Sequence, residues 1–187
     1  MIENVISRIQ KELTETFDNL FIWFERDDKL LNYLPKNGGW SIRKILEHIS
    51  MTNYFLLILI RKGTDKALRK AKEKGFTKLC EPYEFDWIKM QTIGNHLSFH
   101  WNRPIHMEPG GQVPLNDIRK RLQAQLDECL HYLNQMPYGQ GTLYKTMMNV
   151  NELGKIDVYH YIYFLVQHAR RHLTQMEKVR LETQVTS

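Results

Sequence analysis

The stretch DVYHYIYFLVQHARRHLTQM, residues 157–176, carries the clearest structural signal in the chain. Its apolar side chains recur every three or four residues, which is the period of an amphipathic α-helix. The members of this stripe are Val158, Ile162, Leu165, Ala169, Leu173 and Met176. The pattern predicts a long helix that begins near Asp157 and has an apolar side that other helices must cover.

Three other stretches show the same period. The first has a stripe from Ile2 to Phe24 and fades into a loop around Pro35. The second begins after Ser41, a good N-cap residue, and is predicted to run to about Lys62, before Gly63. The third follows Pro114, with Asn116 or Asp117 as its cap, and ends at Pro137. The basic residues 61–74 are predicted to form a separate, solvated short helix.

These four helices, without a convincing strand pattern, predict an all-α four-helix bundle in a single domain spanning residues 1–187. Residues 76–113 are rich in aromatic side chains. We therefore expect a long, partly irregular crossover between the second and third bundle helices, packed over one end of the bundle, with a short helix near residues 85–93. Such a connection suits a bundle whose neighbouring helices do not simply alternate in direction.

Composition narrows the classes of function. The net charge is +5, but much of the excess lies in residues 61–74, which lack interleaved aromatic side chains and match no recognition motif, so we expect no nucleic-acid partner. The longest apolar run, residues 54–60, is too short to span a bilayer, and the N-terminus has no secretion-signal pattern. Two cysteines make no disulfide framework, so we expect a cytoplasmic protein without a membrane partner.

The histidines of the last helix separate on a helical wheel. Relative to Val158, His168 lies about 80° and His172 about 40° to the same side, whereas His160 lies about 160° away on the polar side. His168 and His172 should therefore face the bundle interior, and His160 should face outward. Two inward imidazoles one turn apart either bind one metal ion, as in H-x-x-x-H zinc helices, or are core histidines bonded to nearby polar groups.

The second helix favours the metal interpretation. Its single histidine, His48, lies at the margin of the apolar side and can reach a site between helices. Metal sites in bundles are built from facing helices. Together, His48, His168 and His172 would form a three-histidine site with one open coordination position, which is typical of catalytic zinc.

Other polar residues are predicted to lie outside the three-histidine site. Glu47 is predicted to be a surface charge, and Arg170 lies on the polar side of its helix. Arg171 lies at a flank of the helix, where it pairs either with an anionic substrate or with solvent, and solvent is favoured. Cys129 falls in the apolar stripe of the third helix and is read as a small buried hydrophobe, although a fourth metal ligand there would close the site. A rival cluster in the crossover comprises His96, His100 and His106.

Three stretches resemble motifs of the DinB/YfiT-like superfamily of metal-dependent enzymes. GGWSIRKILEHI, residues 38–49, is similar to the tryptophan, Ser/Thr and histidine signature at the start of the second helix. HARRHLTQ, residues 168–175, is similar to the H-x-x-x-H motif followed by glutamine, and RPIHMEPGG, residues 103–111, resembles the proline-rich segment before the third helix. In order and spacing, the resemblance covers nearly the whole chain.

The resemblance implies a four-helix bundle with a divalent metal ion, zinc or nickel, on His48, His168 and His172. It implies an enzyme that activates water or a thiol for attack on a small electrophile, as a hydrolase or as a thiol S-transferase with a cosubstrate of the bacillithiol type. The resemblance also implies a homodimer that acts on a small-molecule substrate. Gln175 and Tyr161 are candidates for orienting the ligands or lining the pocket. The alternative is a bundle that binds a metal ion or small molecule without turnover.

Overall fold

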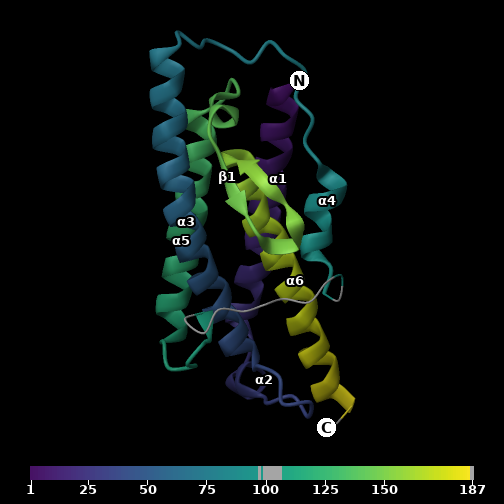
Figure 1. Ribbon diagram of the computed structural model, residues 1–187. Helices are drawn as coiled ribbons and strands as arrows, with labels where there is room; N and C mark the ends of the chain where they lie inside the picture. The colour runs from purple at the N-terminus through teal and green to yellow at the C-terminus, as the bar shows by residue number, and fades with distance from the viewer. Residues whose placement is uncertain (97, 99–106, 186–187) are drawn as a thin grey trace.

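Four long helices form the body of the protein. The computed structural model describes residues 1–96, 98 and 107–185. The long helices are α1 (Ile2–Phe21), α3 (Ile42–Glu73), α5 (Leu115–Gln135) and α6 (Val158–Val185). Helices α1 and α3 each pack against both α5 and α6, so each long helix has two neighbours and the apolar sides meet in one core. The predicted all-α four-helix bundle is confirmed (Figure 1).

The directions of the helices explain the long crossover. In Figure 1, α3 and α5 run in one direction, and α1 and α6 run in the other. The chain must therefore return along the length of the bundle between the end of α3 and the start of α5. On the way it forms α4 (Trp87–Gln91) and η2 (Thr92–Gly94), which pack on α6. The short helix predicted near residues 85–93 is thus present.

Helix α3 is longer than predicted. Ser41 is its N-cap, with Oγ accepting a hydrogen bond from the Lys44 N–H, but the helix continues through Gly63 to Glu73. Gly63 lies inside the helix at a close contact, where a Cβ would lie 3.1 Å from Val158 Cγ2. The basic residues 61–74 are therefore the last turns of α3 and not a separate helix.

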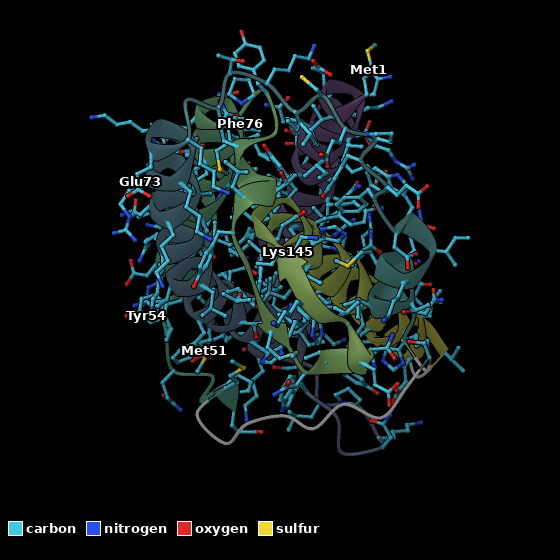
Figure 2. The ribbon with its side chains drawn as sticks, turned by 45° about the horizontal axis from the view of Figure 1, so that its top comes forward. Met1, Met51, Tyr54, Glu73, Phe76 and Lys145 are labelled. Carbon is cyan, nitrogen blue, oxygen red and sulfur yellow. The ribbon has the colours of Figure 1, made fainter. Side chains whose placement is uncertain are left out.

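A small hairpin was not predicted. Strand β1 (Lys145–Met148) pairs antiparallel with β2 (Gly154–Asp157), with Lys145 opposite Asp157 and Met148 opposite Gly154. Figure 2 shows the strand that begins at Lys145 lying across α6. Four-residue strands of mixed polarity are too short to show a two-residue period, which explains why the sequence pattern did not reveal them.

Two boundaries also differ from the predictions. Helix α1 ends at Phe21, and a 3₁₀ turn, η1 (Ile22–Glu25), follows it. The expected loop then contains a short helix, α2 (Asp28–Asn32), which Asp27 caps by accepting from the Leu30 N–H. Helix α5 begins at Leu115 with Pro114 in the N-cap position, earlier than the caps expected at Asn116 or Asp117.

The crossover covers the side of α6 that was predicted to face solvent. Tyr163 and Gln167 are only 0% and 2% exposed, and the His160 ring stacks on Phe85 with centroids 4.1 Å apart. The His160 Nδ1 also bonds to Asp157 Oδ1 at 2.8 Å. Because the aromatic crossover supplies a second packing surface, the outward placement of His160 is wrong. No helix in the described ranges has an apolar stretch long enough to cross a membrane.

Candidate metal centre

Three buried histidines meet between α3 and α6. His48 lies in the second turn of α3, and His168 and His172 lie one turn apart on α6. Their exposed fractions are 5%, 1% and 8%. One ligand atom from each imidazole lies within 4.8 Å of the other two. Among the described residues, no other group of three histidine, cysteine or acidic side chains could hold a metal ion.

Hydrogen bonds orient two of the three rings. The His172 Nδ1 bonds to Gln175 Oε1 at 2.9 Å, and the His48 Nδ1 bonds to the Met107 carbonyl oxygen at 2.9 Å. Both acceptors favour the tautomer with the proton on Nδ1, which leaves Nε2 with a lone pair for the shared site. This is the usual arrangement for a histidine that binds a metal ion through Nε2.

The spacing of the nitrogens fits a tetrahedral ion. The Nε2 atoms of His168 and His172 are 3.1 Å apart. Ligand nitrogens at about 2.05 Å from a tetrahedral zinc ion are about 3.3 Å apart. The centroid of the His48 ring lies 5.3 Å from that of His168 and 4.8 Å from that of His172. The third imidazole therefore lies beside the other two. Two Nε2 lone pairs at this distance would repel unless a proton or a cation lies between them.

Burial keeps the imidazoles of His168 and His172 uncharged. Desolvation, together with the neighbouring His172 and His48, holds the pKa of His168 well below its usual range. Desolvation, and then the charge of His48, lowers the pKa of His172 to about 3. Neutral imidazole is the form that binds metal ions, so His168 and His172 are ready to act as ligands at neutral pH.

The histidines form one end of a cavity of about 380 Å³. Most of its wall is apolar. The Trp40 ring packs on His48 with centroids 4.8 Å apart, and the Thr52 Oγ1 lies 3.5 Å from His48 Nε2. The lining residues are Trp40, His48, Thr52, Phe55, Leu56, Leu59, Met107, Met148, Val150, Phe164, His168, Arg171 and His172.

Of the two other predicted site residues, Gln175 contacts the histidine cluster and Tyr161 does not line the cavity. Gln175 bonds to His172, as described above. Tyr161 lies about two helical turns before His168, and its hydroxyl donates to the Met147 carbonyl and accepts from Thr146. It does not line the cavity. The hydroxyl of Tyr161 therefore bonds to strand β1 of the hairpin.

Cys129 has no place in the histidine cluster. It is fully buried in the core, and desolvation raises the pKa of its thiol. The interpretation of Cys129 as a small buried hydrophobe fits this position. His96 lies in a turn outside the cluster, and His100 and His106 fall outside the described residues.

The crossover covers Glu47 fully and Arg171 in part. Glu47 is only 5% exposed, because the returning crossover lies against it and the Gly111 N–H donates to its Oε2 at 2.7 Å. Arg171 is half-buried at the cavity wall, where its guanidinium donates to the Asn95 carbonyl oxygen. The prediction that Glu47 faces solvent is wrong, because a helical wheel does not include the chain that packs over the bundle, whereas Arg171 remains partly exposed at its flank.

Sequence reasoning also missed several groups around the site. Thr52 follows His48 by four residues and thus lies one turn further along the same side of α3, a spacing that would have identified it. Trp40, the tryptophan of the stretch 38–49, contacts His48 directly. The Met107 carbonyl is a backbone group whose position depends on how the crossover folds, so no sequence pattern indicates it.

Comparison with known proteins agrees with this geometry. Searches among curated proteins and among solved structures gave no match. The sequence profile of the DinB superfamily matches residues 6–176, which include all four long helices in whole or in part and all three histidines. The chain belongs to the DinB superfamily.

Proposed function

We propose that the protein is a metal-dependent enzyme that uses His48, His168 and His172 to hold one divalent ion, with zinc or nickel as the expected metal. The observation that carries the proposal is the convergence of three buried imidazoles at the wall of an open cavity. No cysteine or carboxylate joins this cluster among the described residues. Three protein ligands leave a position for an exchangeable ligand, as in catalytic zinc sites.

The reaction is attack on a small electrophile by water or by a low-molecular-weight thiol. A divalent ion in such a site would supply Lewis-acid activation of either nucleophile. The apolar walls would exclude bulk water from the electrophile. Thr52 contributes a hydroxyl beside the ligand atom of His48, where it can bond to a polar group of the reactants.

The first experiment measures metal content in untagged protein by elemental mass spectrometry. We expect about one equivalent of a divalent metal in the wild type and a large loss in His48→Ala and His172→Ala, because each variant leaves only two ligands. His131→Ala is the matched control, since His131 is exposed on α5 away from the cluster. Metal content unaffected by His48→Ala would contradict a site shared between α3 and α6.

A second experiment separates the two nucleophiles. Cobalt(II) replaces the native metal, and a small thiol is titrated while the visible and near-ultraviolet spectra are recorded. A new charge-transfer band would show thiolate coordination and favour the S-transferase, tested next with the thiol and small electrophiles. An unchanged spectrum, together with ester hydrolysis that depends on His48, would favour the hydrolase. Metal binding without either reaction would favour the non-catalytic alternative.

A further inference from the structure

Arg171 is the one side chain of the Lys, Arg, Asp and Glu classes among the described residues that line the cavity. It precedes the ligand His172 and shares the wall with apolar groups of α3, the hairpin region and α6. Its guanidinium donates to the Asn95 carbonyl oxygen, which fixes it at this wall. The neighbouring Arg170 provides a contrast: it turns toward α1 and pairs with Glu12 Oε2 at 2.6 Å.

The one formal charge on the cavity wall, among the described residues, is the positive charge of Arg171. The three candidate ligands are imidazoles, so they do not neutralise a bound dication. Arg171 directly precedes His172 in α6 and lines the same cavity as the three histidines, so its positive charge lies beside the site. In a largely apolar cavity such charges are weakly screened, and an anionic group on a ligand would be strongly favoured.

The apolar residues of the cavity wall favour an apolar body for the ligand, in addition to its anionic group. These side chains are apolar or aromatic, and they favour a hydrophobic body of the size that a cavity of about 380 Å³ can hold. They are Trp40, Phe55, Leu56, Leu59, Met148 and Phe164.

We infer that Arg171 is a specificity residue that binds the acidic group, a carboxylate or similar anion, of a substrate or thiol cosubstrate whose apolar part lies along this wall. The inference rests on the proposed function, because it places the reacting atom of that ligand at the three histidines. A guanidinium and a carboxylate form charge-assisted hydrogen bonds, which are among the strongest polar contacts in proteins. Lysine at this position would keep the charge but lose the planar fork.

The test uses two thiols that differ only at the far end, mercaptohexanoic acid and mercaptohexanol. Their affinities for the metal-loaded protein are measured by calorimetry. We expect the acid to bind about tenfold more tightly than the alcohol to the wild type, since a hydrogen bond to a charged group contributes roughly that factor or more. Arg171→Gln should remove this preference, and Arg171→Lys should retain part of it.

Arg170→Gln is the matched control. It removes an equal charge from the adjacent position on another side of α6, and the ratio of the two affinities should stay as in the wild type. Equal affinities of acid and alcohol for the wild type would overturn the proposal. A preference for the acid that persists in Arg171→Gln would also overturn it, since the carboxylate would then bind elsewhere, for example at the metal.

The same titrations on metal-free protein separate this proposal from the proposed function. If the protein holds no metal ion, the thiol group has no metal to bind. A preference for the acid that depends on Arg171 would still be measured. Conversely, metal binding that depends on His48 together with equal affinities for the two thiols would leave the metal function standing and remove the role of Arg171. Metal content of each Arg171 variant is measured alongside.

Discussion

At the candidate metal centre, single hydrogen-bond acceptors orient two of the buried imidazoles. The Gln175 Oε1 accepts from the His172 Nδ1, and the Met107 carbonyl does the same for His48. Each acceptor fixes a ring orientation that side-chain packing alone would leave free. The histidine pair therefore depends on a neighbour three residues further along α6, and the strength of this dependence can be measured.

We predict that Gln175→Leu weakens metal binding by about 10- to 100-fold, the usual cost of losing a hydrogen bond to a ligand histidine. The leucine removes the acceptor but keeps a similar volume. Gln175→Glu is the control, because a carboxylate still accepts from Nδ1 and should retain or strengthen binding. Competition with a chromophoric chelator gives both affinities. Equal affinities for the leucine variant and the wild type would show that Gln175 only packs at the edge of the bundle.

The lowered pKa of His172 predicts how metal-free protein responds to acid. Above pH 6.5 the imidazole is neutral in both the folded and the unfolded chain, so it adds no pH dependence. Below pH 6.5 the unfolded chain gains a proton first, because the folded pKa is about 3. Stability should therefore fall as the pH drops from 6.5 toward 3, by about 1.4 kcal/mol at pH 5.5 from this residue.

The measurement is urea unfolding of chelator-treated protein at pH 7.5 and pH 5.5. His172→Gln replaces the imidazole with a group that does not titrate, so the loss of stability between these pH values should be smaller by about that amount. An identical loss in the wild type and the variant would contradict the buried, neutral state of His172.

For single residues, the sequence predicted the side of the helix on which each one lies. It did not predict which of these sides the crossover covers. The wheels placed His168 and His172 toward the interior and His48 at the margin of the apolar side, because the period of a helix fixes the side on which each residue lies. They also placed Glu47 and His160 on solvated sides, where the crossover in fact covers both. The folding of an aromatic loop cannot be derived from helical period.

At the scale of elements, α3 shows how a glycine can be required inside a helix. Gly63 was predicted to follow the end of the helix, yet α3 continues for ten residues to Glu73. Its missing side chain lets Val158, the first residue of α6, and the Tyr144 ring approach the α3 backbone. The close contact aligns the start of α6 and therefore the helix that carries two of the histidines.

We predict that Gly63→Leu destabilises the protein by about 1–3 kcal/mol, because the new side chain overpacks a filled contact. Lys62→Leu is the matched control: it introduces the same residue one position earlier, at an exposed site of the same helix, and should change stability by less than about 0.5 kcal/mol. Denaturant unfolding measures both variants. Equal stability of the Gly63 variant and the wild type would show that the contact can open without cost.

At the scale of the whole molecule, the histidine cluster lies where two helices of opposite direction meet. The long return of the chain between α3 and α5 places the crossover over α6, and its last described part brings the Met107 carbonyl to His48. The number and pattern of long helices were predictable, because apolar stripes specify them one at a time. Their mutual arrangement, and the hairpin across α6, depend on long-range contacts that such stripes do not encode.

This arrangement predicts that metal binding stabilises the whole fold. An ion on His48, His168 and His172 would link α3 to α6, so it should bind the folded chain far better than the unfolded one. At a free metal concentration about 100 times the dissociation constant, the free energy of unfolding should rise by about 2.7 kcal/mol. Thermal unfolding with and without zinc or nickel measures the change. His48→Ala should lose most of it, because the ion would then contact α6 alone, whereas His131→Ala should retain it. Equal stabilisation of the His48 variant and the wild type would mean that the ion does not join the two helices.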